Sequence, residues 1–371
     1  MKVNEQRKYL ENRSLLKSWS FRSIGPTIMS GRVVDIDANP ADPTEFYVAY
    51  ATGGLWYTHN NGQSFEPVFD SESVISIGDI AVNWQNRQIW LGSGEVNSSR
   101  SSYAGNGIYK SNDGGKSWQW LGLPESQHIG KIVLDPTNPN TAWVAVLGHL
   151  YSANKERGVY KTTDGGKSWQ QTLYIDDQTG VVDLDINPKN PNELYAAAWY
   201  RTRSAWNFEE SGASSGLYKS VDAGEHWSRI NSPGSGLPSN KYVGRMGIAV
   251  YPASPNIVYA VLDNQEPLPD TAVNKKNDSL YQLDDFKGIS AAAFARLNND
   301  KLEKFLRARH IPAKYSATSV KQLVAEGKLA PTAIYDYLNI DDGFTNTNIH
   351  GCQVYRSDDA GKHWRLTHEK K

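Results

Sequence analysis

Cysteine is almost absent from this chain of 371 residues, and neither sign of charge dominates. Cys352 is the only cysteine, so no disulfide can form within the chain, and cysteine usage indicates no redox compartment. The 39 Lys and Arg residues balance 40 Asp and Glu residues, which gives a net charge of −1. No cluster of basic residues could neutralise a phosphate backbone, and we therefore expect no nucleic-acid partner.

Long apolar runs are missing as well. No stretch of about 18 apolar residues could span a bilayer, so we expect no membrane insertion. The N-terminal segment MKVNEQRKYLENRSLLKSW lacks the apolar core of a secretory signal. No HExxH metal motif, phosphate-binding glycine loop or Ser/His/Asp spacing occurs, and we expect neither a metal nor a cofactor.

A nine-residue motif is repeated along the chain. KTTDGGKSW has close copies in KSNDGGKSW, KSVDAGEHW and RSDDAGKHW, and a weaker copy in YTHNNGQSF. The acidic or amide residues of the five copies are Asn60, Asp113, Asp164, Asp222 and Asp359. The first four follow one another at intervals of roughly 50 residues, as the blades of a propeller do, and the longer gap before the fifth requires an insertion.

Each period also contains the same strand pattern. An apolar run led by glycine, such as GKIVLD, is followed in most copies by a proline turn such as DPTNPN. A second run carries an aromatic residue near its centre, as in AWVAV, and a third run, such as GVYKT, leads into the motif. We therefore predict an all-β fold, a β-propeller of four-stranded blades with a small α-helical insertion.

The repeated motif is interpreted as a structural turn, because five copies of a catalytic turn would be unusual. The carboxylate can accept backbone N–H bonds from the residues that follow it, and the glycine two positions later can adopt positive φ. The closing tryptophan is expected to pack between neighbouring sheets. These tryptophans are Trp118, Trp169, Trp227 and Trp364.

The pattern S/T-x-D-x-G-x-S/T-W resembles the Asp box, or bacterial neuraminidase repeat, of sialidases, xyloglucan-degrading enzymes and sortilin-type receptor domains. The order FRSIGP, SGRVVDI, GGLWYTHNNG, HIGKIVLDP and GLYKSVDAGEHW is similar to that of large bacterial sortilin-like proteins often labelled glycosyl hydrolases. The resemblance implies export to the periplasm, cell surface or medium. It also implies that this chain is the N-terminal portion of a longer protein, with a C-terminal continuation of the propeller missing from it.

The strand pattern breaks between blade-like segments near the C-terminus. We expect an N-terminal arm at 1–20, blades one to four with the start of blade five at 21–263, a helical insertion at 264–350, and the end of blade five at 351–371. Apolar residues in the insertion have helical spacing, with Ser290, Asn299 or Thr318 as possible N-caps. The insertion could be a solvated cap, or a lid or docking module.

Candidate ligand-binding residues fall in two groups. The loops between second and third strands carry Glu95, Arg100, His149, Arg157, Arg201, Arg203 and Trp206. The residues after the strand-leading glycines are Arg32, Asp79, Lys131, Val181 and Arg245. We expect the second group to lie at one height near the mouth of the channel, where three cations against one acid would attract the carboxylate of a peptide C-terminus or an acidic sugar. The alternative is that Asp79 pairs with one neighbour and the other charged residues are solvated.

Two functions remain open. The first is a sortilin-like binding protein that recognises peptide or glycan at the loop face or in the channel. The second is a sialidase-like or xyloglucanase-like glycoside hydrolase, which needs two carboxyl groups. Glu95, Glu156, Glu209 and Glu210 could provide them, but Ala51 occupies the position of the acid in xyloglucan-degrading enzymes, and no catalytic residue is assigned.

Overall fold

The computed structural model describes residues 31–268, 281–338 and 349–368, together with isolated residues between 6 and 19. The chain divides into two compact units. One comprises Met1–Glu266 and Gly351–Lys371, and the other is Pro267–His350. The FRSIGP segment and most of the expected N-terminal arm lie outside the described residues.

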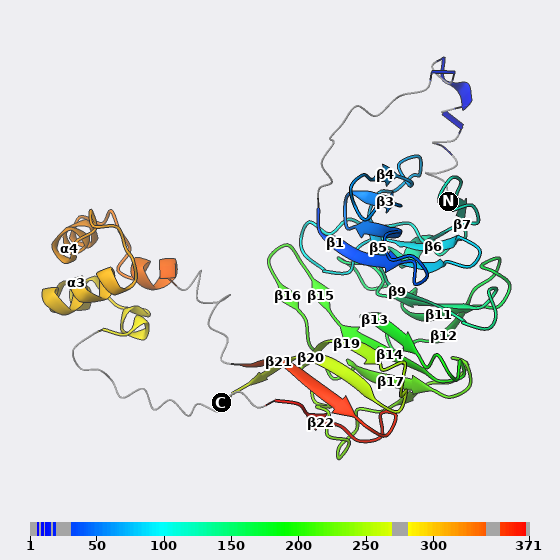
Figure 1. The fold of residues 1–371 in the computed structure, drawn as a ribbon. Helices are drawn as coiled ribbons and strands as arrows, with labels where there is room; N and C mark the ends of the chain where they lie inside the picture. The colour runs from blue at the N-terminus through cyan, green and yellow to red at the C-terminus, as the bar shows by residue number, and fades with distance from the viewer. Residues whose placement is uncertain are drawn as a thin grey trace. The chain divides into compact units, whose positions relative to one another are not determined.

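The described residues of the first unit form five four-stranded antiparallel sheets, each with its strands paired in chain order (Figure 1). Blades one to three contain β1 (Val33–Ala38), β2 (Phe46–Tyr50), β3 (Gly54–Thr58), β4 (Glu66–Pro67), β5 (Ile77–Asn83), β6 (Gln88–Ser93), β7 (Ile108–Ser111), β8 (Gln119–Trp120), β9 (Ile129–Leu134), β10 (Ala142–Val146), β11 (Gly158–Thr162) and β12 (Gln170–Leu173). Blades four and five contain β13 (Thr179–Ile186), β14 (Leu194–Tyr200), β17 (Gly216–Ser220), β18 (Ser228–Arg229), β19 (Val243–Val250), β20 (Val258–Pro267), β21 (Ile349–Ser357) and β22 (Arg365–Leu366). This topology confirms the predicted β-propeller of four-stranded blades.

The position of each strand in its blade follows from its residues. The second strand is packed on both faces, which is why β10, with the sequence AWVAV, is apolar throughout and fully buried. The outer strands β4, β8 and β18 have only two residues each and are largely exposed. Short outer strands limit the row of unpaired backbone groups that a sheet edge presents.

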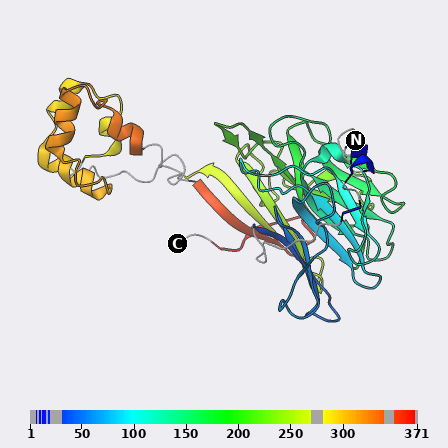
Figure 2. The same cartoon turned by 90° about the horizontal axis from the view of Figure 1, so that it is seen from above.

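Consecutive blades pack through their inner strands, with β1, β5, β9, β13 and β19 following one another (Figure 2). The apolar clusters combine residues of adjacent blades, as where Trp90 of blade two packs with Ile132 and Tyr160 of blade three. At the first blade, Val33 and Ile36 on β1 are about half exposed, at 49% and 57%. Burial between blades, more than within one sheet, therefore forms the core.

The repeated turn is an Asp box in its hydrogen bonds. Asp113 Oδ1 accepts the backbone N–H of Ser117 at 2.9 Å, and its Oδ2 accepts the Ser117 hydroxyl at 2.6 Å. The hydroxyl of Ser111 bridges the turn, donating to Asp113 and accepting the N–H of Gly115 at 2.8 Å. Gly115 has φ +92°, which confirms the expected left-handed glycine.

The boxes of blades two to five also contact the blade before them. Trp118 Nε1 donates to the carbonyl of Val68 in blade one at 2.6 Å, and Trp169 Nε1 donates to Leu121 of blade two at 2.9 Å. In the other direction, the Tyr47 hydroxyl of blade one donates to the carbonyl of Gly114 at 3.2 Å. The box is therefore a joint between blades, as its architectural interpretation predicts.

The second unit is a small helical domain inserted between β20 and β21. It contains η2 (Leu283–Phe286), α2 (Ala291–Ala295), α3 (Asn299–Ala308) and α4 (Ala317–Ala325), and residues 333–338 are also helical. Ser290 caps α2 as expected, but the other two cap predictions were wrong. Asn298 and Ser316 cap α3 and α4, because their side chains accept the N–H groups three residues later, whereas Asn299 and Thr318 already lie inside the helices.

Candidate functional site

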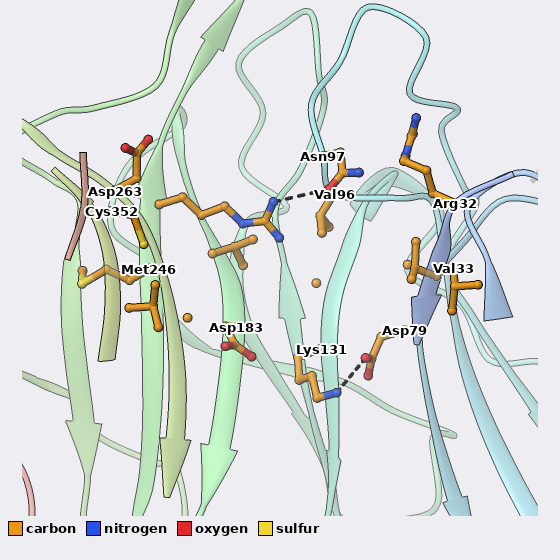
Figure 3. Close-up of a pocket in the computed structure, with 17 residues that line it drawn as sticks. Arg32, Val33, Asp79, Val96, Asn97, Lys131, Asp183, Met246, Asp263 and Cys352 are labelled. Carbon is orange, nitrogen blue, oxygen red and sulfur yellow. Dashed lines mark hydrogen bonds and ion pairs between the residues drawn. The ribbon is translucent and has the colours of Figure 1, made fainter. Parts of the chain in front are cut away.

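A cavity of about 610 Å³ lies among the inner strands, where a propeller has its channel (Figure 3). The labelled polar residues form two tiers in this view. Arg32, Asn97 and Asp263 lie in the upper tier, and Asp79, Lys131 and Asp183 lie in the lower one. Arg245 also lines the cavity.

The expectation that the residues after the leading glycines share one height was wrong. Every inner strand has a register shift near the cavity, and equivalent positions are defined by their partners on the second strand. Val181 pairs with Ala198 and is fully buried, so it contributes to the core and Val182 lines the cavity instead. The residues at one level are Asp35, Asp79, Lys131, Asp183 and Gly247.

The lower tier is therefore a lysine among carboxylates. Lys131 Nζ contacts Asp79 Oδ1 at 2.9 Å, and the other oxygen of Asp79 accepts the N–H of Ile132 at 2.7 Å. Burial raises the pKa of Asp79 and the charge of Lys131 counteracts it. Partial burial lowers the pKa of Lys131, but the negative charges around it, led by that of Asp79, together outweigh this effect and raise it. Burial also raises the pKa of Asp183 to about 6. This tier has no excess of positive charge.

The upper tier holds the two arginines. Arg32 Nη2 contacts Glu95 Oε1 at 2.5 Å, and Glu95 is fully buried in the loop after β6. Arg245 Nη1 reaches only the amide oxygen of Asn97, at 3.5 Å, and its guanidinium lies 5.6 Å from the ring centre of Trp199. Among the described residues, Arg245 is the cavity cation that has no carboxylate in ion-pair contact.

Several predicted loop residues lie outside this cavity. Arg157 and Arg201 are buried, and their guanidinium groups donate to backbone carbonyls of the loop after β10. His149 in that loop contacts Glu125 at 3.2 Å. Arg100 is exposed, and its carbonyl accepts the hydroxyl of Tyr151. These residues belong to the loop group of candidates, and none of them lines the channel cavity.

A small hairpin carries the remaining candidates. β15 (Thr202–Arg203) pairs with β16 (Phe208–Glu209), and Trp206 at its tip is 89% exposed. Arg203 stacks on the ring of Phe208 at 4.5 Å. An exposed tryptophan has an apolar face that no other part of the described chain covers, which suits contact with a ligand.

A set of aspartates joins the inner strands of neighbouring blades, and sequence reasoning named only Asp79 among them, as a ligand-binding candidate. Each carboxylate accepts a backbone N–H from the inner strand of the next blade, at 2.6 to 3.2 Å. These residues are Asp35, Asp37, Asp79, Asp183 and Asp185. The signal was present in DID and DLD, because an acid at every second position of an otherwise apolar strand needs a buried donor.

The carboxylates considered for hydrolysis differ in their surroundings. Glu156 and Glu209 are exposed, and Glu95 is held by Arg32. Burial, followed by the negative charge of Asp263, raises the pKa of Glu210. Ala51, at the position of the acid in xyloglucan-degrading enzymes, is buried.

Within the described residues, no group of three or more His, Cys, Asp or Glu residues could hold a metal ion, and no helix is long and apolar enough to cross a membrane.

Five four-stranded blades joined by Asp boxes define an Asp-box β-propeller with a channel-mouth cavity. The Sortilin-Vps10 family model (sortilin, neurotensin receptor 3) matches residues 106–294, slightly more than half of the chain. The chain therefore belongs to the Sortilin-Vps10 family. Comparison with curated protein sequences finds no match.

Solved structures with a similar arrangement include two GH74 enzymes. An ancestral GH74 enzyme has 22% identity and a TM-score of 0.48, with 64% of this chain and 30% of that chain covered. The GH74 xyloglucanase from Xanthomonas campestris has 12% identity and a TM-score of 0.43, with 92% and 46% covered. YCF48 from Cyanidioschyzon merolae has 14% identity and a TM-score of 0.41, with 92% and 86% covered. The chain thus spans less than half the length of these GH74 enzymes.

Proposed function

We propose that this chain is a binding propeller that receives an anionic group of a peptide or glycan at the mouth of its channel. Arg245 carries the proposal, because it lines a cavity of about 610 Å³ without a carboxylate partner among the described residues. Arg32 and Lys131 are already paired with Glu95 and Asp79. An extracytoplasmic location, which the sortilin-like resemblance implies, is part of the proposal.

The chemistry of the upper tier suits a carboxylate ligand. The Arg245 guanidinium presents a planar fork that can donate two parallel hydrogen bonds to a carboxylate. Asn97 beside it can donate or accept, and so can adapt to hydroxyl or amide groups of the same ligand. The exposed Trp206 on the hairpin after β14 offers a flat surface for a sugar ring or an aromatic side chain.

The test is calorimetric binding of peptides with a free C-terminal carboxylate, their amidated counterparts, and an acidic oligosaccharide. Arg245→Gln should weaken binding of the anionic ligands by about tenfold or more, the loss expected for one charge-assisted pair. Arg296→Gln, at an exposed position in the helical unit, is the control. Equal affinities of wild type and Arg245→Gln would refute binding at this cavity.

Glycoside hydrolysis is the second candidate, and Glu210 favours it. Its carboxyl group has a raised pKa beside Asp263, which lines the cavity, and a hydrolase needs one protonated and one ionised carboxyl group. Measuring new reducing ends in the oligosaccharide samples distinguishes the two functions. Release of reducing ends that Glu210→Gln abolishes would replace the binding proposal by an enzymatic one.

A further inference from the structure

A second, smaller cavity of about 170 Å³ lies between the loops of blades three and four. It shares no lining residue with the channel cavity. Its polar lining includes three arginines, one serine from each loop and a glutamine. These residues are Arg157, Arg201, Arg203, Ser152, Ser204 and Gln178.

Two of the arginines are almost completely buried. Arg157 is 1% exposed and Arg201 is 2% exposed. Arg157 donates from its two terminal nitrogens to four carbonyls, including Leu147 at 2.6 Å and His149 at 2.8 Å. Arg201 makes only longer bonds to carbonyls, at 3.3 to 3.4 Å. Both arginines thus stabilise the loop after β10 by donating hydrogen bonds to its carbonyls.

Backbone carbonyls do not supply the missing negative charge. Within the described chain, none of the three arginines has a carboxylate within ion-pair distance, and the buried Nε of Arg157, Arg201 and Arg203 has no hydrogen-bond partner. Asp176 and Asp177 act on Arg157 only from a distance, as Glu210 does with Arg203. A buried charge without a counter-charge is costly, so two buried arginines beside a partly buried third are unusual.

The positive field in this region also affects its other titratable groups. Burial, followed by repulsion from Arg157 and Arg245, lowers the pKa of Arg201 to about 9. Burial and then the charge of Arg201 lower the pKa of the buried His128 to about 4. Burial is the larger cause of both shifts, and the charges of the neighbouring arginines act in the same direction.

We propose that the cavity between blades three and four binds an oxyanion, such as a sulfate or phosphate group, free or carried by a larger ligand. Arg203 is the arginine available to a ligand, because its guanidinium donates no hydrogen bond to a described carbonyl. It stacks on the ring of Phe208. Guanidinium groups bind oxyanions through paired hydrogen bonds, and the hydroxyls of Ser152 and Ser204 can add neutral donors. The site shares no lining residue with the cavity that contains Arg245.

The experiment is isothermal titration calorimetry of the full chain with sodium sulfate, against sodium chloride at the same ionic strength. Wild type should bind sulfate in a saturable manner. Arg203→Gln should weaken this binding about tenfold or more through the loss of a charge-assisted pair. Arg203→Lys should give an intermediate affinity, because it keeps the charge and loses the planar fork.

Two matched variants make the result specific. Arg100→Gln removes an exposed cation from the blade-two loop, outside the lining of this cavity, and should leave sulfate affinity nearly unchanged. Arg245→Gln should also leave it nearly unchanged, even where that variant abolishes binding of peptide or glycan. The proposal is refuted by equal sulfate affinity in wild type and both Arg203 variants, by sulfate binding that only Arg245→Gln removes, or by no saturable binding beyond that of chloride. Sulfated and phosphorylated sugars, titrated next, distinguish a free ion from a group on a larger ligand.

Discussion

At the residue scale, the carboxylate of each Asp box is held by its own turn. Hydrogen bonds from Ser117, first from its hydroxyl and then from its backbone N–H, lower the pKa of Asp113 to about 2. In blade one, Asn60 takes the same place, accepts the N–H of Ser64 at 3.0 Å, and holds the turn without a charge. The geometry therefore requires an acceptor oxygen, and the charge adds a pH-dependent contribution.

Substitution of Asp113 should separate these two contributions. Asp113→Ala removes the acceptor and should lower the free energy of unfolding by roughly 1 kcal/mol at pH 7, because the site is exposed. Asp113→Asn should stay close to wild type at pH 7. The folded pKa of about 2 lies below the ordinary 3.8, so this carboxylate stabilises the fold above pH 3.8 and loses its effect as the pH falls towards 2.

The measurement is the melting temperature between pH 7 and pH 2, followed by circular dichroism. Wild type should lose more stability than Asp113→Asn over the range from pH 4 to pH 2. The difference should be partial, because Asp164, Asp222 and Asp359 also have lowered pKa values. The same acid dependence in both proteins would contradict the assignment.

At the scale of elements, the aspartates of one inner strand satisfy donors on the next. Asp37 on β1 accepts the N–H of Val82 at 2.8 Å and the indole N–H of Trp84 at 2.7 Å. Asp183 and Asp185 on β13 likewise accept backbone N–H groups of β19. An inner strand has one edge without a ladder partner, and these carboxylates satisfy some of its N–H groups.

Asp37→Ala should therefore destabilise the joint between blades one and two. The change leaves two partly buried donors without acceptors, and the expected cost is roughly 1–3 kcal/mol in the free energy of unfolding. Glu66→Ala, at an exposed position on β4, is the matched control and should change stability by less than about 0.5 kcal/mol. Urea denaturation measures both, and equal stability of the two variants would show that the carboxylate bridges contribute little.

At the scale of the whole molecule, the helical insertion and the blades have separate cores. Phe286, Phe294 and Phe305 pack with Leu302 and Val320 inside the insertion. Blade five is formed by strands from both sides of it, since β20 and β21 are neighbours in one sheet. A sheet whose chain is interrupted in this way needs only that the ends of the insertion lie close together, and closing a flexible loop costs little.

Replacing residues 270–348 by a short Gly/Ser linker should therefore leave the blades folded. Circular dichroism should lose its helical signal and keep the β signal, and the melting temperature of the remaining transition should stay close to that of the intact chain. Wild type measured under the same conditions is the reference. Simultaneous loss of both signals would show that the insertion supports the blades.

The sequence by itself determined the blades, the boxes and the place of the insertion, because the interactions that define them are short-range. The hydrogen bonds of a box span at most four residues, as from Asp113 to Ser117, and the glycine of each turn is visible in the sequence. Apolar runs of strand length between such turns leave few alternatives to a four-stranded blade. The inner-strand aspartates were visible too, but their partners lie in another blade.

Only the tertiary structure decided what faces the channel. A register shift near the start of each inner strand changes which side chains point into the channel. Counting from the leading glycine predicted Val181 at the common height of the channel residues, but Asp183 lies there. Pairs such as Arg32 with Glu95, 63 residues apart, and Lys131 with Asp79, 52 residues apart, form only when neighbouring blades pack. The charge of the channel mouth therefore depends on strand register and on contacts between blades, neither of which residue spacing along the chain determines.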